Sequence, residues 1–179
     1  PLPLLPLHIL WMNLVTDSFP ALALATEQGG DDVMQRPPRR KEDHLLSGEM
    51  GLMLASAVLS TLVALYVFHV ARVLFPADHL LVARSAVLTT CVLFQMLLAI
   101  SARSPYPAFF PHLFANRWLG TAILFSCTVH ALLLFSPVAS LFSLTRIPPS
   151  LWVHVFASAA MAYVLFECAK GVRKWRRKR

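Results

Sequence analysis

The sequence is short of charge. Only 14% of its 179 residues are Asp, Glu, Lys or Arg, whereas 57% are hydrophobic. A soluble globular chain carries about 25% charged residues, so this composition excludes an ordinary soluble domain and is typical of a membrane protein. Long polar runs are also missing. The longest one, from Gly29 to Gly48, is too short to build a hydrophobic core of its own.

Cysteine is scarce and scattered. Cys91, Cys127 and Cys168 are an odd number and lie far apart in apolar runs, which predicts neither a disulfide framework nor a cysteine metal cluster. The n-region of a signal peptide is missing too, and the chain begins with Pro1 rather than Met. We therefore expect the sequence to be a piece of a longer protein.

Five apolar segments make up most of the chain. Each is close to the roughly 20 residues that an α-helix needs to cross a bilayer, and short breaks rich in proline, charge or aromatic residues separate them. We predict an all-α membrane protein with a single transmembrane domain over residues 1–179. Its five helices are expected at about residues 7–26, 50–74, 82–101, 118–136 and 151–169, with a basic tail at 170–179.

Basic residues gather on one side of this predicted bundle. If the first segment ends in the cytoplasm, only Arg72, Arg84 and Arg146 of the 16 Lys and Arg residues lie on the opposite side. The positive-inside rule then predicts an external start and a cytoplasmic C-terminus. Because the basic tail directly follows an apolar segment, we interpret it as an anchor on membrane lipid rather than a nucleic-acid patch. The expected protein is an integral, multi-pass one.

The first apolar segment, HILWMNLVTDSFPALALATE, carries Asn13, Thr16 and Asp17 near its middle. An ionised carboxylate there costs about 2.5–3.5 kcal/mol on insertion scales. In a regular helix the three residues share one face, and their amide, hydroxyl and carboxylate oxygens suit hard cations such as Ca²⁺, Mn²⁺ or Na⁺. Pro20 has no N–H for the carbonyl of Thr16, so we predict a helix that is distorted near its middle.

Two considerations limit this interpretation. Such residues can also form a helix–helix hydrogen-bonding patch in which Asp17 is simply buried or protonated. Moreover, Ca²⁺ takes 6–8 oxygen ligands, and one carboxylate does not neutralise a divalent ion. A complete cation site therefore needs ligands from other segments.

The stretch LWMNLVTDSFPALALATE, followed by DDVMQRPPRRKE, resembles the sixth membrane helix and next cytoplasmic loop of type II, calcium-transporting P-type ATPases. Their pattern is N-x-x-T-D, then Pro-Ala, then M-x-R-P-P-R. It is matched here by Asn13, Thr16, Asp17, Pro20, Ala21, Met34 and the run from Arg36 to Arg39. One departure is Ser18, where many members have Gly. The resemblance covers the whole chain, which corresponds to helices six to ten.

This resemblance implies the membrane half of an ATP-driven pump that exports Ca²⁺ from the cytoplasm, with Mn²⁺ or Na⁺ as alternatives. Asn13, Thr16 and Asp17 become metal ligands. The stretch FQMLLAISARS resembles the eighth helix, and it has Gln95 where two-ion pumps carry Glu, which implies one Ca²⁺ per cycle. Gln95 is then either a further ligand or the donor or acceptor of an interhelical hydrogen bond.

In that family the phosphorylated D-K-T-G loop and the nucleotide domain, which use ATP and Mg²⁺, precede the sixth helix. We therefore expect N-terminal pump domains as partners, on the same or a separate polypeptide, and no ATP hydrolysis by this chain alone. The loop after the first segment contacts the phosphorylation domain in the family. Asp31, Asp32, Arg36 and Arg39 are thus candidates for coupling, with a solvated positive-inside loop as the alternative.

A different class of protein also fits the apolar segments. A truncated or split relative could keep the helices as an accessory or scaffold membrane protein and lack transport. A D-K-T-G motif upstream in the same reading frame would favour the pump, whereas a start codon near Pro1 would favour the scaffold. The expected location is a bacterial inner (plasma) membrane.

Overall fold

The computed structural model describes residues 1–26, 50–76, 79–103 and 116–176, and within these ranges it contains helices and no strands. Five helices are long and apolar enough to cross a membrane. They are Pro6–Ala25, Met50–Leu74, Leu80–Ala102, Arg117–Phe135 and Pro149–Val172. The predicted all-α bundle of five spans is therefore confirmed. The coupling candidates Asp31, Asp32, Arg36 and Arg39 lie outside the described residues.

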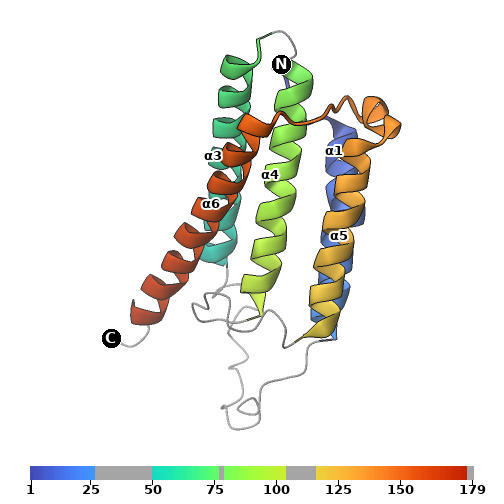
Figure 1. Ribbon diagram of the computed structural model, residues 1–179. Coiled ribbons are helices and arrows are strands. Elements are labelled where there is room, and N and C mark those ends of the chain that lie inside the picture. Colours follow the sequence, from blue (N-terminus) through green and yellow to red (C-terminus); the bar gives the residue numbers. More distant parts are fainter. Residues whose placement is uncertain (27–49, 77–78, 104–115, 177–179) are drawn as a thin grey trace.

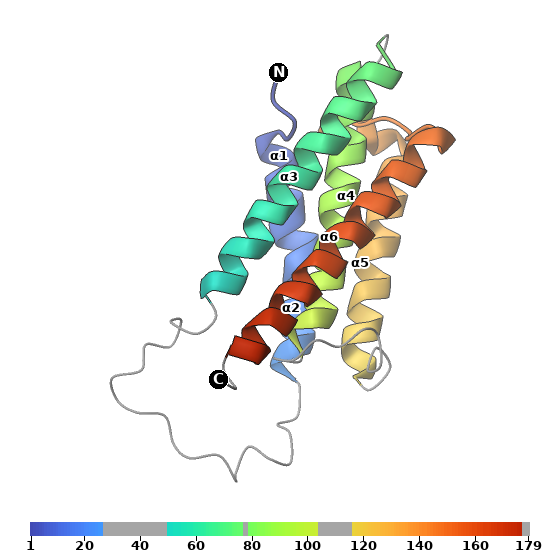
Figure 2. The same cartoon turned by 90° about the vertical axis from the view of Figure 1, so that its left-hand side faces the viewer.

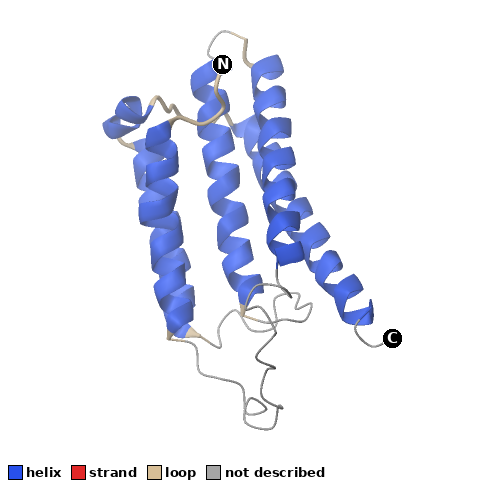
Figure 3. Cartoon of the chain, turned by 180° about the vertical axis from the view of Figure 1, so that it is seen from behind, coloured by secondary structure: helices blue, strands red, loops and turns tan. Residues whose placement is uncertain are grey.

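The first span consists of three consecutive pieces: α1 (Pro6–Trp11), the π-helix η1 (Met12–Asp17) and α2 (Ser18–Ala25). The other elements are α3 (Met50–Leu74), α4 (His79–Ala102), α5 (Arg117–Phe135), the 3₁₀-helix η3 (Pro137–Phe142) and α6 (Pro149–Arg176). α4 stands between two pairs of helices, α3 with α6 on one side and the first span with α5 on the other (Figures 1 and 3). Figure 2 shows α3 and α6 slanting in the same direction, both inclined to the more upright α4.

Local sequence explains where several helices begin. Asn116 precedes α5, and its side-chain oxygen accepts hydrogen bonds from the N–H groups of Trp118 (2.9 Å) and Leu119 (3.1 Å). This is the preferred way to satisfy the donors of a first turn. Pro6 and Pro149 open α1 and α6, at a position where the missing N–H costs nothing.

The last helix is longer than its apolar segment. α6 continues to Arg176, beyond the end predicted at residue 169. Lys and Arg are good helix formers, and their charge is favourable near the C-terminus of a helix. Hydropathy therefore predicts the extent of the apolar span, whereas the helix itself continues into the basic segment.

The core of the bundle is built around α4. Within its most apolar stretch 61% of the residues are buried by the chain, against 17% for α3. Ala83 and Ala86 of α4 and Ala71 of α3 are completely buried, and such small residues let membrane helices approach closely. Leu151 and Val155 of α6 complete the same cluster. This packing fixes the position of α4, against which η1 lies.

Candidate ion site

The first span is broken at its polar residues. From Met12 to Asp17 the backbone has π-helical spacing, and regular α-helix resumes at Ser18. π-turns within α-helices are frequently found at functional sites. Pro20, two residues after the resumption, has no N–H to offer to a carbonyl in the preceding turn. The predicted distortion is therefore present, at the expected place.

Thr16 and Gln95 face each other between η1 and α4. Thr16 is completely buried, and its hydroxyl lies 2.8 Å from the carbonyl oxygen of Met12 and 3.1 Å from Oε1 of Gln95. A hydroxyl has only one proton, so it donates to one of these oxygens at a time. The interhelical hydrogen bond, one of the two roles expected for Gln95, thus ties the broken segment to the central helix.

Asn13 and Asp17 lie on the other side of η1. Both side chains are exposed on the surface of the chain, while Thr16 points inward. The π-turn is the reason that the three residues do not share one face, as they would in a regular helix. Among the described residues no basic group forms an ion pair with Asp17. Two oxygen-bearing side chains therefore stand on a face that the described part of the chain leaves open.

Two serines bond to carbonyls of the broken turn. The hydroxyl of Ser18 donates to the carbonyl of Asn13 (2.8 Å), and that of Ser126, in α5, donates to the carbonyl of Val15 (3.1 Å). Ser18 is the departure from the family pattern noted above. Ser126 was not predicted, because one serine in an apolar helix gives no signal of the helix that it contacts.

Other buried polar side chains pair between helices away from η1. Nε2 of His130, in α5, lies 3.0 Å from the hydroxyl of Thr89, in α4, and Nζ of Lys170, in α6, lies 2.9 Å from the carbonyl oxygen of Ser101, in α4. No three His, Cys, Asp or Glu side chains gather as a metal site within the part of the chain that the structure describes. These pairs therefore hold helices together and do not supplement the oxygens of the first span.

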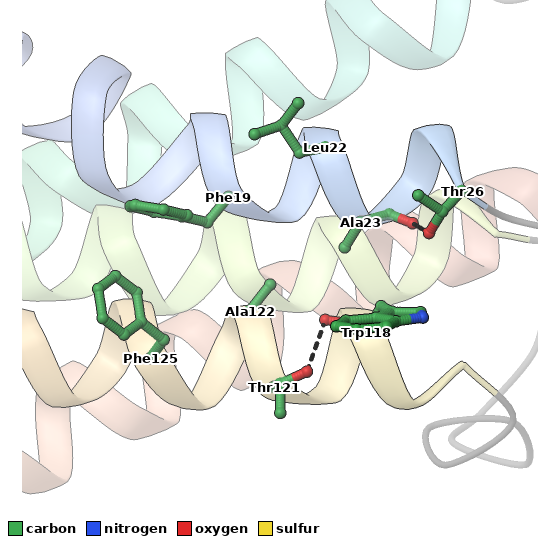
Figure 4. Close-up of a pocket in the computed structure, with 8 residues that line it drawn as sticks. All are labelled: Phe19, Leu22, Ala23, Thr26, Trp118, Thr121, Ala122 and Phe125. Atoms are coloured by element: carbon green, nitrogen blue, oxygen red, sulfur yellow. Dashed lines mark hydrogen bonds between the residues drawn. The ribbon is translucent and has the colours of Figure 1, made fainter.

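A groove of about 390 Å³ lies between α2 and α5 beyond the π-turn (Figure 4). It is lined by Phe19, Leu22, Ala23, Thr26, Trp118, Thr121, Ala122 and Phe125. Its two hydroxyls are used locally: that of Thr26 donates to the Ala23 carbonyl, and that of Thr121 lies 2.6 Å from the Arg117 carbonyl oxygen and 3.0 Å from that of Trp118. The groove is thus apolar and has no chemistry for a cation.

These features define a multi-pass membrane protein with an interrupted first span. Residues 1–172 match the family described as "Cation transporting ATPase, C-terminus". The chain therefore belongs to this family of cation-transporting ATPase C-terminal regions, as the motif in its first segment indicated.

Individual relatives agree with the family match. The chain is 31% identical to the "Calcium-transporting ATPase" of Bacillus subtilis (strain 168), over 97% of this chain and 20% of the relative. It is 32% identical to "Calcium-transporting ATPase 1" of Schizosaccharomyces pombe, over 99% and 19%. It is 34% identical to the human "Calcium-transporting ATPase type 2C member 1", over 76% and 15%.

The chain thus spans about a fifth or less of the length of these relatives. They come from a bacterium, a fungus and an animal. Because of this range of organisms, location in a bacterial inner membrane stays a prediction. The ligand roles of Asn13, Thr16, Asp17 and Gln95 also stay predictions.

Proposed function

We propose that this chain is the C-terminal membrane part of an ATP-driven pump that exports Ca²⁺ from the cytoplasm, and that Asn13 and Asp17 bind the ion within the membrane. The observation that carries the proposal is the π-turn at these residues. Irregular backbone is tolerated at membrane depth where protein or a cavity satisfies it. Interrupted helices of this kind hold cations in transporters.

The number of oxygens supports a shared site. Ca²⁺ takes 6–8 oxygen ligands, and the open face of η1 offers the amide oxygen of Asn13 and the two carboxylate oxygens of Asp17. Thr16 and Gln95 stand behind them and can add oxygens from the α4 side. The remaining ligands, together with ATP and Mg²⁺, would come from N-terminal pump domains that cover this face. The names of the relatives favour Ca²⁺ over Mn²⁺ or Na⁺.

The charge distribution supports an orientation. The first residue of the chain and the C-terminal end of α6 lie at opposite ends of the bundle (Figure 1). Arg84 lies at the end where the chain starts, since its Nε donates to the carbonyl of Leu2 (3.3 Å). That end holds few basic residues, whereas the other end holds the basic C-terminal segment. By the positive-inside rule the C-terminus is cytoplasmic, in contact with lipid headgroups.

Replacing Asp17 by Asn in the complete protein that contains this chain tests the site. The measurement is phosphoenzyme formation from ATP as a function of Ca²⁺ concentration. Loss of a group that merely supports a metal ligand costs about 10–100-fold in affinity, so loss of a ligand charge should raise the half-maximal Ca²⁺ concentration at least about 100-fold. Thr128→Ala is the matched control, because Thr128 is exposed and its hydroxyl donates to the Leu124 carbonyl of its own helix.

An Asp17→Asn protein with an unchanged Ca²⁺ response would show that the site is elsewhere. The identity of the ion is tested by repeating the titration with Mn²⁺ and with Na⁺. Phosphoenzyme that depends on Na⁺ but not on Ca²⁺ would contradict the calcium assignment and leave the location of the site intact.

A further inference from the structure

Three carbonyl groups of the π-turn accept hydrogen bonds from side-chain hydroxyls. The carbonyl of Met12 lies 2.8 Å from the hydroxyl of Thr16, and that of Asn13 accepts from Ser18. The carbonyl of Val15 accepts from Ser126, across the interface with α5. Carbonyl groups within the hydrocarbon core of a membrane need such partners, because no water is present to replace them. Thr16 and Ser18 belong to the first span itself, whereas Ser126 belongs to a different span, α5.

Ser126 behaves differently from its neighbours on α5. Hydroxyl side chains in membrane helices commonly bond back to a carbonyl of their own helix. Thr121 and Thr128 do so, with the carbonyls of Arg117 (2.6 Å) and Leu124 (2.7 Å). Ser126 is completely buried and instead donates to Val15 at 3.1 Å. The bond that it makes is therefore directed at the broken segment.

We propose that Ser126 is a positioning residue of the ion site. Its hydroxyl donates to the Val15 carbonyl and thereby stabilises the π-helical backbone conformation, in which the Asn13 and Asp17 side chains lie together on the open face. Val15 lies between these two residues in the sequence, so a rotation of its peptide group changes their relative direction. The inference rests on the proposed function, because it assigns Ser126 a role in that same site.

Without the Ser126 hydroxyl, the Val15 carbonyl needs a backbone N–H as its hydrogen-bond donor. Regular α-helical spacing supplies such a donor, so the loss favours an α-helix over the π-turn. The side chains of Asn13 and Asp17 would then be less well oriented to bind the same ion. The expected consequence is weaker Ca²⁺ binding, while the reaction at saturating Ca²⁺ proceeds as before. One hydrogen bond of ordinary strength corresponds to about a 3- to 10-fold change in the half-maximal Ca²⁺ concentration.

The test compares Ser126→Ala, Ser126→Cys and Ser126→Thr in the complete protein, with Thr128→Ala as the matched control. Cys keeps the size of Ser but is a weak donor, and Thr keeps the hydroxyl. We expect the half-maximal Ca²⁺ concentration for phosphoenzyme formation to rise in the order Thr, Cys, Ala. The maximal phosphoenzyme level should stay within about twofold of the parent level, and Thr128→Ala should behave as the parent.

Thermal melting with and without Ca²⁺ separates positioning from mere packing. We expect the melting midpoint of Ser126→Ala to change little in EDTA, and its increase on addition of Ca²⁺ to be smaller than that of the parent. A lower midpoint in EDTA with an unchanged half-maximal Ca²⁺ concentration overturns the inference. So does an equal effect of Thr128→Ala.

The two proposals fail in different ways. If the parent protein forms no cation-dependent phosphoenzyme, the proposed function is refuted and the role of Ser126 falls with it. If the parent responds to Ca²⁺ and Asp17→Asn abolishes the response, but the three Ser126 variants match the parent, only the role of Ser126 is refuted.

Discussion

The buried pair of Glu167 and Lys170 in α6 allows a quantitative test of how α6 is held against α4. Nζ of Lys170 lies 3.2 Å from Oε1 of Glu167, 2.9 Å from the carbonyl oxygen of Ser101 and 2.8 Å from the Ser101 hydroxyl. Ser101 also donates to Glu167, so two helices share one network. Glu167 is completely buried and Lys170 is 3% exposed.

Lys170→Met removes the cation from this network and keeps an aliphatic chain of similar length. Removing one partner of a buried ion pair costs about 3–5 kcal/mol, because a charge is left in a poorly solvated place. Glu167→Gln should cost less, about 1–3 kcal/mol, since Lys170 keeps its two contacts with Ser101. Replacing both, as Glu167→Leu with Lys170→Met, should restore most of the stability, since an apolar pair of similar volume needs no solvation.

The free energy of unfolding of the complete protein is measured in SDS titrations, with mass spectrometry following modification of the buried Cys91 thiol in α4. Arg72→Met is the control, because Arg72 is exposed and lies over the Phe68 ring at 5.6 Å, a contact that contributes about 0.5–1 kcal/mol. The reasoning is refuted if Lys170→Met costs less than about 1 kcal/mol. It is also refuted if the double replacement is less stable than Lys170→Met alone.

Two further predictions concern the ends of helices. Asn116→Ala removes the acceptor of two N–H groups at the start of α5 and should lower the free energy of unfolding by about 1 kcal/mol. Asn116→Asp keeps the acceptor and should keep most of the stability. Thermal melting of both variants checks this prediction. His8→Ala removes a ring that accepts from the Leu5 N–H (3.2 Å) and donates to the Phe142 carbonyl (2.6 Å), which should cost about 1–3 kcal/mol. If melting of His8→Ala matches that of the parent, the ring does not tie α1 to η3.

Much of the fold could be predicted because transfer of an apolar helix into a bilayer depends on its own residues. Length and hydropathy were enough to find five spans, and Pro20 was enough to expect a break at Thr16 and Asp17. α6 continues past its apolar segment to Arg176, since Lys and Arg are good helix formers. The motif from Asn13 to Ala21, together with the run from Met34 to Arg39, indicated the family, which the match over residues 1–172 confirmed.

The contacts that shape the candidate site could not be predicted in the same way. The carbonyl of Val15 and the hydroxyl of Ser126 are 111 residues apart in the sequence, and Thr16 and Gln95 are 79 apart. A serine in an apolar helix bonds to its own backbone in one fold and to a neighbouring helix in another. The rotation of each helix, set by packing around α4, decides which of these bonds is made.

The sequence alone determined the membrane class, the number of spans, the asymmetry of charge and the presence of a break in the first helix. These properties follow from composition, proline and spacing within single segments. Only the tertiary structure decided that Thr16 turns inward while Asn13 and Asp17 stay on the open face, and that Ser126 reaches the broken turn. Those outcomes depend on how neighbouring helices satisfy backbone groups that water cannot reach within a membrane.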